Sequence, residues 1–500
     1  MEKEISLRLI KPQFELYSKP AQFNLIMAGQ GGGKSYGIGI MSGSLISDCC
    51  ESIGLVAANT YDQLSRATLK TMFEVWKKVF GYTEYDAKTN PGGYYVFGKM
   101  PPPHFKPHGH TLVSNNNNIY TKDGGVIFTA SLDNFTAIEG IEIGWALLDE
   151  TADTKEEAVK SVILGRLRQK GLCRANRGFA YAPSGHEDAT DPVNPLFIFT
   201  KPAKVPWLNE MFGLEDHRDG IISNIYDHKK FFHFNDGQKQ IIIYSAYLNQ
   251  KNLPPDYIEG RKSVISPDLI ASHIYGDPFA KTGDEFVPDF DAAVHVKKVE
   301  PSYDYPLHVS IDFNAKPYMS ALLIQLIEDG EGYEVRVLDE YALQSPKNTA
   351  GNLAIELEQD YSDLCEMGLF VYGDASGNNS IPIMGRTSFF DDFTKNLTIP
   401  FKLRVPKKNP SYASISPGSM GRKAFINSLF SGGKGVKVVV DPKCQEFIAD
   451  LKFCKEDANG KMKKEKDKDG VELRGHHLDA FAYFVCHPAG LGKFAKMPKE

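Results

Sequence analysis

The sequence predicts an α/β protein of two domains, with a mostly parallel sheet in the N-terminal half and a second α/β domain after it. Three observations predict this class. Short apolar runs alternate with helical patterns through the N-terminal half, which is typical of a parallel sheet covered on both faces. A glycine-rich stretch, 29–33, separates the first apolar run from the first helical pattern. The C-terminal half opens with strands in close succession, which is typical of a meander.

Length, charge and cysteine content narrow the class of protein. The 500 residues suffice for two or more domains, and a net charge of −6 excludes a basic field over the whole chain. Any surface for nucleic acid must therefore be local. The seven cysteines are scattered without a C-x-x-C pair, as expected of reduced thiols in a cytosolic protein. We expect no secretory signal and no membrane partner, since no apolar run is long enough to span a bilayer.

The domain boundary is expected in a stretch that contains Gly, Pro and Asp and has little periodicity, around residues 281–301. We predict a first domain over 1–285 and a second over 305–490. Residues 286–304 are predicted to link them, and 491–500 to form a tail. Two separately folded parts are therefore expected.

The first apolar run leads into a loop with the composition of a phosphate-binding site. The loop fits the pattern G-x4-G-K-[ST] with alanine in the first place, and it comprises Ala28, Gly29, Gln30, Gly31, Gly32, Gly33, Lys34 and Ser35. In such a loop, backbone amides cradle phosphate oxygens, the lysine reaches the β and γ phosphates, and the serine hydroxyl binds Mg²⁺. The sequence therefore predicts a P-loop NTPase domain that binds ATP and Mg²⁺. A chance glycine-rich turn is the alternative.

The segment before the first strand offers side chains for the base of a nucleotide. Gln13 could contact an adenine through its amide, and Phe14 could stack on it. A plain docking segment explains this stretch at least as well, so both interpretations stay open.

Further elements follow the loop in the order expected of this fold. Ile53–Ala58 reads as a buried strand and Asp62–Phe80 as an amphipathic helix. A later apolar strand, Gly144–Leu148, ends in two adjacent acids, Asp149 and Glu150. In P-loop ATPases the first acid of such a pair holds Mg²⁺ through water, and the second polarises the attacking water as a general base. We expect these roles for Asp149 and Glu150.

Residues 156–170 are predicted to form a helix that carries Arg166 and Arg168. ATP hydrolysis builds negative charge on the γ-phosphoryl oxygens, which an inserted arginine stabilises. Either arginine could serve, in its own subunit or in a neighbour's site, and a solvated or DNA-facing helix is the alternative. Residues 178–184 read as a strand that ends in a Pro-Ser turn, where a polar loop would suit a sensor of the γ-phosphate.

Three separated acids stand at the ends of elements in the C-terminal half. Asp312 lies near the end of an alternating strand, Asp374 ends a later apolar strand, and Asp479 lies in the first turn of an apolar helix over 476–485. Each alone is ordinary turn chemistry. In this order they are typical of an RNase H-like fold, which converges three carboxylates on two divalent ions that cleave a phosphodiester. Oxygen ligands suit Mg²⁺ or Mn²⁺, so the sequence predicts an RNase H-like α/β nuclease domain.

Basic residues gather at 402–408 and 422–423, and a mixed-charge stretch at 455–468 reads as a hairpin. These segments could contact DNA phosphates irrespective of base sequence. A solvated face is the usual alternative for such runs of charge.

A phosphate-loop ATPase followed by a carboxylate-triad nuclease in one chain resembles the large terminase subunit of tailed bacteriophages. The resemblance covers roughly residues 20–490 and is carried by the order of short motifs at 28–35, 138–140, 147–150, 182–184, 310–312, 372–374 and 477–480. One departure concerns the phosphate loop. Many members carry an arginine inside it where this chain has Gln30, which leaves the source of the catalytic arginine open.

The resemblance implies a motor that uses ATP to move viral double-stranded DNA into a procapsid, and a nuclease that cuts concatemeric DNA. It implies a ring, typically a pentamer, on the portal protein, and a small terminase subunit that selects the DNA; in isolation the chain could be a monomer. It also implies the host cell cytoplasm, with transient residence on the procapsid. Two alternatives are a DNA helicase or translocase with an inactive nuclease-like domain, and a non-enzymatic nucleotide-switched scaffold.

Overall fold

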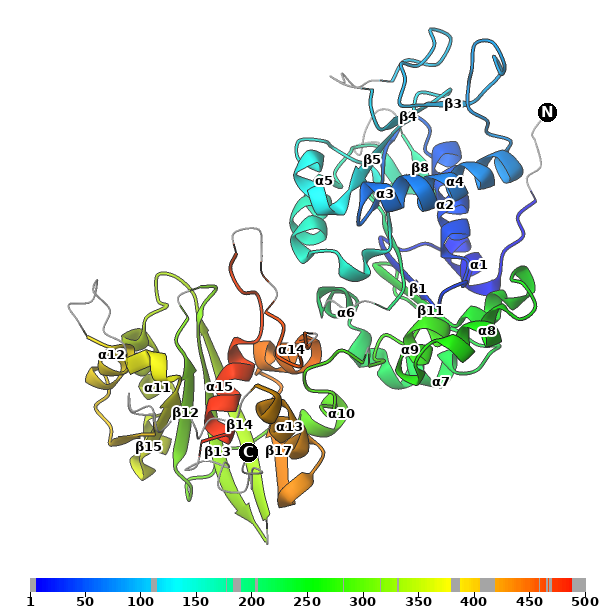
Figure 1. Ribbon diagram of the computed structural model, residues 1–500. Coiled ribbons are helices and arrows are strands. Elements are labelled where there is room, and N and C mark those ends of the chain that lie inside the picture. The colour runs from blue at the N-terminus through cyan, green and yellow to red at the C-terminus, as the bar shows by residue number, and fades with distance from the viewer. Residues whose placement is uncertain are drawn as a thin grey trace. The chain divides into compact units, whose positions relative to one another are not determined.

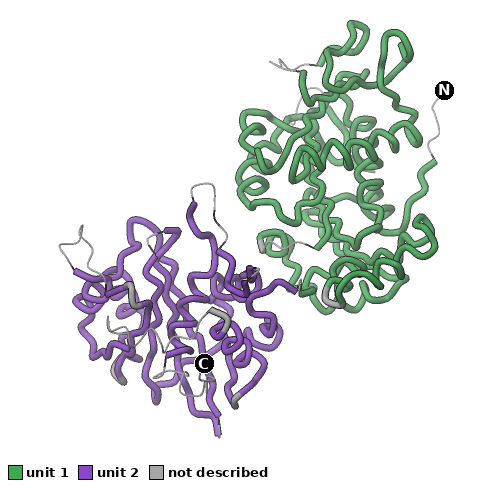
Figure 2. Tube along the Cα trace, viewed as in Figure 1, with its two compact units in different colours: residues 1–282 green, residues 283–500 purple. Residues whose placement is uncertain are grey.

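The computed structural model divides into two compact units, residues 1–282 and 283–500 (Figure 2). The structure describes residues 6–108, 115–176, 178–182, 190–202, 206–281, 283–314, 316–330, 332–378, 387–404, 419–457, 459–464, 466 and 470–487. Each unit has its own sheet and its own buried core. Across the ranges just given, no helix is long and apolar enough to cross a bilayer.

A nine-stranded sheet forms the centre of the first unit, in the order β10-β11-β1-β9-β6-β2-β5-β4-β3 (Figure 1). The strands from β11 to β5 pair in parallel, and the antiparallel pairs lie at the two edges. Their bounds are β1 (Phe23–Ala28), β2 (Ile53–Ala58), β3 (Tyr95–Phe97), β4 (Asn118–Thr121), β5 (Val126–Ser131), β6 (Trp145–Asp149), β9 (Leu196–Thr200), β10 (Phe232–Asn235) and β11 (Lys239–Tyr244). The predicted α/β class with a mostly parallel sheet is confirmed.

Helices cover both faces of this sheet, which is why its central strands read as continuous apolar runs. They are α1 (Lys11–Ser18), α2 (Lys34–Asp48), α3 (Tyr61–Gln63), α4 (Lys70–Val75), α5 (Leu164–Arg166), α6 (Pro206–Phe212), α7 (Arg218–Ile225), α8 (Tyr257–Val264) and α9 (Pro267–Ile270). α3 and α4 belong to one continuous helical segment over 61–80, as the apolar spacing predicted. α2 and α4 share a core with Ile26 and Val56, while the neighbouring Leu25 and Leu55 face the opposite core.

Two features of the first unit differ from the sequence prediction. The strand predicted at 178–184 is β8 (Phe179–Tyr181), which pairs only with β7 (Leu172–Arg174) in a small separate sheet. Sequence analysis missed β9, although β9 lies between β1 and β6 in the main sheet. Its carboxyl end therefore adjoins both the phosphate loop and the acid pair, where ligands of parallel sheets bind.

The second unit is built on a six-stranded sheet in the order β16-β15-β12-β13-β14-β17. β12, β13 and β14 form the predicted antiparallel meander, β15 and β16 extend it in parallel from β12, and β17 pairs in parallel with β14. The bounds are β12 (Leu307–Asp312), β13 (Met319–Asp329), β14 (Gly332–Leu343), β15 (Leu369–Gly373), β16 (Phe401–Leu403) and β17 (Val436–Val440). The α/β class expected of this domain is confirmed, and β17 adds a sixth strand at the β14 edge.

Two groups of helices sandwich the second sheet (Figure 1). They are α10 (Ala292–His295), α11 (Ala350–Tyr361), α12 (Phe389–Lys395), α13 (Ser419–Phe430), α14 (Gln445–Phe453) and α15 (His476–Val485). α11 and α12 share a core with Val309 and Ile311 of β12. α13, α14 and α15 pack on the other face, against side chains of β13 and β14.

The stretch predicted as a linker, 286–304, lies within the second unit. Phe286, Val287 and Phe290 are buried in its core, and the Phe286 N–H donates to the Cys454 carbonyl at 2.8 Å. The Pro and Asp residues of this stretch form turns between the apolar side chains that are buried in the core. The division between the units falls earlier, after Thr282.

Candidate functional site

The glycine-rich stretch forms the turn from β1 into α2. Ala28 is the last residue of β1, and Lys34 is the first residue of α2. Gly31 and Gly33 have φ values of +82° and +84°, a left-handed conformation that a side chain would strain. The loop places the start of α2 at the carboxyl end of a central parallel strand. The N–H groups of the first turn of this helix lack intrahelical acceptors. This arrangement suits a phosphate group.

Three side chains brace the outer side of the loop. Each holds one glycine carbonyl: Asn249 Nδ2 donates to Gly31 at 2.7 Å, Tyr244 OH to Gly32 at 2.9 Å, and Gln13 Nε2 to Gly33 at 2.9 Å. In a trans peptide the N–H points away from the carbonyl. The bonds that hold the carbonyls outward therefore turn the N–H groups of Gly33 and Lys34 toward the loop interior, ready for an anion.

One of the two described hydrogen bonds of Gln13 holds the loop. Besides the bond to Gly33, its Oε1 accepts from the Ile10 N–H at 3.2 Å. The contact of Gln13 with an adenine stays a prediction, whereas the bracing role was missed by sequence analysis. Asn249 and Tyr244 were missed too, because they lie more than 200 residues from the loop in sequence.

Lys34 lies in the centre of the site. Its Nζ donates to the carbonyls of Ala28 at 3.1 Å and Gly29 at 3.4 Å, and it lies 3.9 Å from Glu150 Oε1. Burial lowers the pKa of Lys34, and the charges of Glu150 and Asp149 oppose that shift. A buried ammonium that faces mainly carbonyl oxygens is well placed to receive phosphate oxygens.

The acid pair stands at the carboxyl end of β6, as predicted. Asp149 is buried, accepts a hydrogen bond from Thr68 Oγ1 at 2.6 Å, and has its pKa raised to about 6 by burial. Glu150 has φ of +52°, an uncommon conformation for a residue with a side chain. Its Oε2 is buried without a hydrogen-bond partner among the described residues. Backbone strain and an orphaned carboxylate oxygen together mark a functional position.

The residues present fit the Mg²⁺ that accompanies ATP. Ser35 lies in the first turn of α2, and Asp149 ends β6, a parallel strand that only β9 separates from β1. Hydroxyl and carboxylate oxygens are the ligands that Mg²⁺ prefers. The orphaned Oε2 of Glu150 leaves an acceptor for a water beside them.

A second lysine enters the site from β9. Lys201 directly follows β9, and its Nζ lies 4.0 Å from Glu150 Oε2. Sequence analysis missed Lys201 together with β9. The signal that could have found it is a polar residue at the end of the apolar run Leu196–Thr200, because polar residues at strand ends mark ligand sites in parallel sheets. Pro183 and Ser184 of the turn predicted as a γ-phosphate sensor lie outside the described residues. Among the described residues, Lys201 stands beside Glu150.

Arg166 and Arg168 lie at the opposite end of β6. The Ile143 N–H donates to the Arg166 carbonyl at 2.9 Å, and the Arg168 N–H donates to the Ile143 carbonyl at 3.1 Å. Ile143 precedes Asp149 along the extended chain by roughly 20 Å, at about 3.3 Å per residue. That is farther than an arginine side chain extends, so neither residue serves the loop of its own chain. That Arg166 or Arg168 acts at the phosphate loop of a neighbouring subunit stays a prediction.

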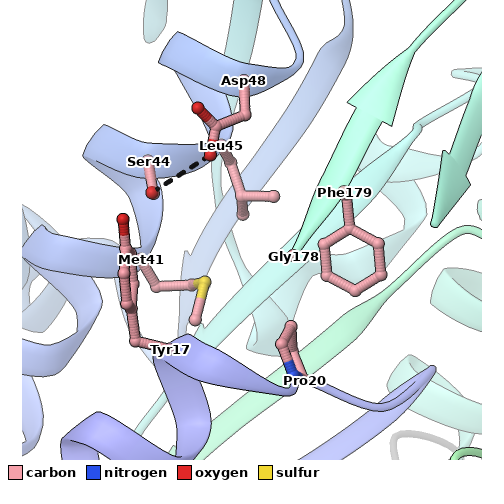
Figure 3. A pocket seen from close by; sticks show the side chains of 8 residues that line it. All are labelled: Tyr17, Pro20, Met41, Ser44, Leu45, Asp48, Gly178 and Phe179. Carbon is pink, nitrogen blue, oxygen red and sulfur yellow. Dashed lines mark hydrogen bonds between the residues drawn. The ribbon is translucent and has the colours of Figure 1, made fainter. Parts of the chain in front are cut away.

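A small cavity lies beside the far half of α2 (Figure 3). It encloses about 40 Å³ and is lined by Tyr17, Pro20, Met41, Ser44, Leu45, Asp48, Gly178 and Phe179. Met41 stands seven residues beyond Lys34 on α2, about 10 Å along the helix axis. The cavity is mostly apolar and has room for about one water, so it is unrelated to the nucleotide site.

In the second unit, β12 and β15 bring two predicted acids together. These strands are parallel neighbours with Ile311 beside Gly373. Asp312 and Asp374 therefore leave the sheet at equivalent positions on strands about 4.8 Å apart.

α15 supplies the third acid. Ser310 Oγ donates to a backbone carbonyl of α15 at 2.5 Å, which fixes the helix against β12 and places Asp479 near the strand end. One turn further along α15, the pKa of Tyr483 is raised by burial and, in addition, by the negative charges of all three acids. The charges of Asp312, Asp374 and Asp479 therefore all act on the Tyr483 phenol, so the three acids lie in one region of this unit.

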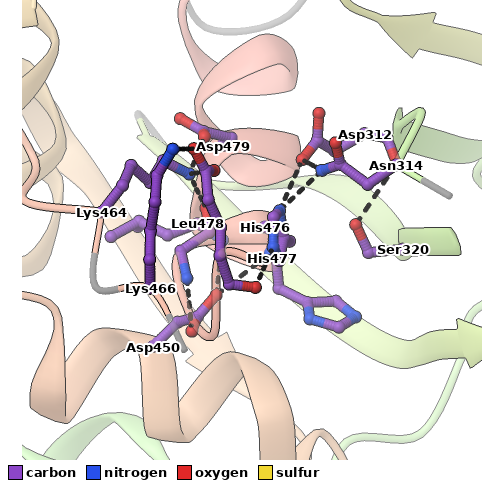
Figure 4. A network of polar contacts seen from close by, with 12 residues as sticks. Asp312, Asn314, Ser320, Asp450, Lys464, Lys466, His476, His477, Leu478 and Asp479 are labelled. Carbon is purple, nitrogen blue, oxygen red and sulfur yellow. Dashed lines mark hydrogen bonds and ion pairs between the residues drawn. The ribbon is translucent and has the colours of Figure 1, made fainter. Parts of the chain in front are cut away.

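Asp312 is held by two polar neighbours (Figure 4). Its Oδ2 lies 3.2 Å from His476 Nδ1 and also accepts from Asn314 Nδ2. Burial opposes a charge on His476, but the hydrogen bonds to Asp312 and to the Glu472 carbonyl, together with the Asp312 charge, raise the pKa of the imidazole. These contacts orient one face of the Asp312 carboxylate. Asn314 was not singled out in the sequence.

A lysine forms an ion pair with the third acid, Asp479. Lys464 Nζ donates to Asp479 Oδ2 at 2.6 Å and lies 3.7 Å from Glu472 Oε2 (Figure 4). Burial alone would lower the pKa of Lys464, but the charge of Asp479, its hydrogen bond, and the charges of Asp312 and Glu472 raise it. The ammonium therefore stays charged beside the carboxylates.

The three acids have the chemistry of a Mg²⁺ or Mn²⁺ site but not its geometry. Within the described parts of the chain, no three His, Cys, Asp or Glu side chains are grouped closely enough to hold a metal ion. Lys464 neutralises Asp479 in this arrangement. The acids share one region without forming a metal site as they stand.

Some of the predicted basic residues border this region. The Arg422 guanidinium lies 5.8 Å from the centre of the Tyr483 ring, and Arg404 lies 4.9 Å from the centre of the Phe370 ring. Lys423 pairs with Glu456. Residues 405–408 of the first basic cluster lie outside the described residues.

Comparison with known proteins finds similarity only among solved structures. No protein-family model and no curated protein matches the chain. The large terminase of a thermophilic bacteriophage, solved with ATP-γ-S, is 16% identical at a TM-score of 0.36, covering 97% of this chain and 100% of that one. The large terminase of bacteriophage HK97 is 11% identical at 0.42, covering 96% and 95%. The nuclease domain of the P22 large terminase is 13% identical at 0.30, covering 43% and 94%.

All three matched structures belong to the kind of protein that the sequence motifs resemble. Because these identities and TM-scores are low, no residue role is taken from the matched structures. The roles are inferred from the geometry described above. Two solved structures to which this chain is similar over nearly its whole length are large terminases of bacteriophages.

Proposed function

We propose that this chain is the ATP-hydrolysing and DNA-cutting subunit of a viral DNA-packaging motor. The observation that supports the proposal most is that Lys34, at the start of α2, lies beside Asp149 and Glu150 at the carboxyl end of β6, with only β9 between β1 and β6. The second unit adds three acids around Tyr483, the residue types that phosphodiester cleavage requires.

In the proposed reaction the loop amides and Lys34 bind the phosphates of ATP. Glu150 accepts a proton from a water whose oxygen bonds to the γ-phosphorus, while the bond from that phosphorus to the ADP oxygen breaks. The products are ADP and phosphate. Ser35 and Asp149 would hold Mg²⁺, which supplies charge neutralisation at the phosphates. Lys201, beside Glu150, orients that carboxylate and links the site to β9.

In the second unit, Asp312, Asp374 and Asp479 would hold divalent ions for DNA cleavage once Asp479 is released from Lys464, and such ions would supply an activated water and a Lewis acid. Double-stranded DNA, the portal protein, a small terminase subunit and further copies of this chain are the proposed partners. The proposed place of action is the host cytoplasm, at the procapsid.

One observation favours a second candidate, a DNA translocase whose nuclease-like unit is inactive. Lys464 holds Asp479, and the described residues contain no ready metal-binding trio. The two functions share the ATPase and differ only in DNA cleavage.

The test measures phosphate release and cleavage of double-stranded DNA in parallel, with ATP and Mg²⁺ or Mn²⁺. We expect Lys34→Ala to lose ATP hydrolysis and keep cutting, and Asp374→Asn to do the reverse. Lys70→Ala and Asp363→Asn, at exposed positions, are matched controls that keep both activities. ATP hydrolysis without any cutting would establish the translocase, and a wild-type chain that does not turn over ATP would refute both functions in favour of a nucleotide-switched scaffold.

A further inference from the structure

Helix α8 brings an arginine to the phosphate loop of the same chain. The Arg261 guanidinium donates from Nη2 to Gln30 Oε1, in the third position of the loop. The backbone of Gln30 is held as well, because its N–H donates to the His273 carbonyl at 2.6 Å. The side chain and backbone of one loop residue are thus bound to segments 231 and 243 positions later in the chain.

Close packing fixes α8 at this place. A Cβ on Gly31 would lie 2.9 Å from the Tyr257 ring, and a Cβ on Gly29 would lie 2.2 Å from the Ile274 carbonyl oxygen. Glycines at 29 and 31 therefore allow the segment around α8 to touch the loop backbone. The backbone that carries Arg261 is therefore closely packed against the loop.

The Arg261 guanidinium has N–H donors in addition to the one that binds Gln30. Arginine carries five N–H donors, and Arg261 Nε is buried without an acceptor among the described residues. Across the same residues no carboxylate forms an ion pair with Arg261, whereas its neighbour Lys262 pairs with Glu259 at 3.3 Å. A partly buried, uncompensated positive charge beside a phosphate loop is best explained by an anion that the ligand supplies.

Three other cations considered for this role are placed differently. Lys201 pairs with Glu150, and Arg166 and Arg168 lie at the far end of β6. Phosphoryl transfer gains from a positive charge on the γ-phosphoryl oxygens in addition to the loop lysine.

We propose that Arg261 binds the phosphates of a nucleotide held in the loop of its own chain, with Gln30 as its tether. The inference rests on the proposed ATPase function. As the bond between the γ-phosphorus and the ADP oxygen breaks, negative charge grows on oxygens that Arg261 can neutralise. The arginine that this step uses then comes from α8, and needs no neighbouring subunit.

The test compares kcat and KM for ATP in the full-length chain. Arg261→Gln should lower kcat about 10²-fold or more, the usual loss when a donor to developing charge is removed. Lys262→Gln, one position along the same helix, is the matched control and should stay within about twofold. Arg261→Lys keeps the charge and should retain more activity than Arg261→Gln, which covers the case in which the Gln variant fails to fold.

Two further variants separate a phosphate-binding role from simple bracing of the loop. If Arg261 only braced Gln30, Gln30→Ala would lose as much activity as Arg261→Gln; we expect a smaller loss. The exchange variant Gln30→Arg/Arg261→Gln returns a guanidinium to the loop and should recover kcat at least about fivefold over Arg261→Gln. Wild-type hydrolysis with an unchanged kcat in Arg261→Gln overturns this inference alone, whereas absence of wild-type hydrolysis overturns the proposed function.

Discussion

Lys464 donates a hydrogen bond to Asp479 at 2.6 Å, inside the group of acids that the sequence assigned to metal binding. Charges from Asp312 and Glu472 also act on this ammonium and help to raise its pKa. A lysine is thus the cation of this site in the structure. A divalent ion that binds Asp479 must displace it, so Lys464 and metal compete for one carboxylate.

The first prediction follows from this competition. Lys464→Gln should lower the Mg²⁺ or Mn²⁺ concentration that gives half-maximal DNA cleavage several-fold, because Asp479 is released from its ion pair. Lys466→Gln is the control and should leave that concentration unchanged, because Lys466 pairs with Glu472 at 3.8 Å and, among the described residues, with none of the three acids. A metal requirement that stays the same or rises in Lys464→Gln would contradict the competition.

The second prediction concerns the pH dependence of stability at Asp149. Its pKa rises from about 3.9 in the unfolded chain to about 6 in the folded chain, so the folded state binds its proton more tightly. The stabilisation is complete below about pH 4 and is lost as the pH rises through about 6. Asp149→Asn cannot ionise, and should gain about 1–3 kcal/mol of unfolding free energy relative to wild type between pH 4 and pH 8.

Urea unfolding without nucleotide or metal measures this difference. Asp153→Asn, at an exposed position shortly after β6, is the control and should show a pH-independent difference from wild type. An Asp149→Asn difference that stays constant with pH would show that burial does not perturb this carboxyl.

The third prediction concerns the bracing of the loop. Asn249→Ala removes the bond to the Gly31 carbonyl, so the loop should lose order and the Kd for ATP should rise about three- to tenfold, the equivalent of one net hydrogen bond. Asn224→Ala removes the same kind of bond, to the Gly220 carbonyl at 2.8 Å in α7, and should leave nucleotide affinity unchanged. Equal affinity in the Asn249→Ala variant would mean that the loop holds its shape without this brace.

Much of the fold was predictable because the signals are local. The apolar runs before Ala28 and Asp149 identify strands, and the glycines after Ala28 identify the turn. The convergence of Asp312, Asp374 and Asp479 was also predictable, since strand ends and helix starts fix where such side chains lie.

What the sequence did not disclose depends on long-range packing. Arg261 and Asn249 reach the loop from positions more than 200 residues away, and no local pattern marks them. Lys201 was missed because β9 is only five residues long and no local pattern shows that it inserts between β1 and β6. The segment 286–304 looked like a linker, because burial of Phe286 and Phe290 depends on partners elsewhere in the second unit.

The central claim is that Glu150, strained at φ +52° and 3.9 Å from Lys34, activates water at an ATP site formed by the loop. Its most direct test measures ATP binding and ATP turnover on the same preparation of Glu150→Gln, with the exposed Glu74→Gln as the control. We predict that Glu150→Gln binds ATP as tightly as wild type and hydrolyses it at least about 10²-fold more slowly. Turnover at the wild-type rate in Glu150→Gln would contradict the account.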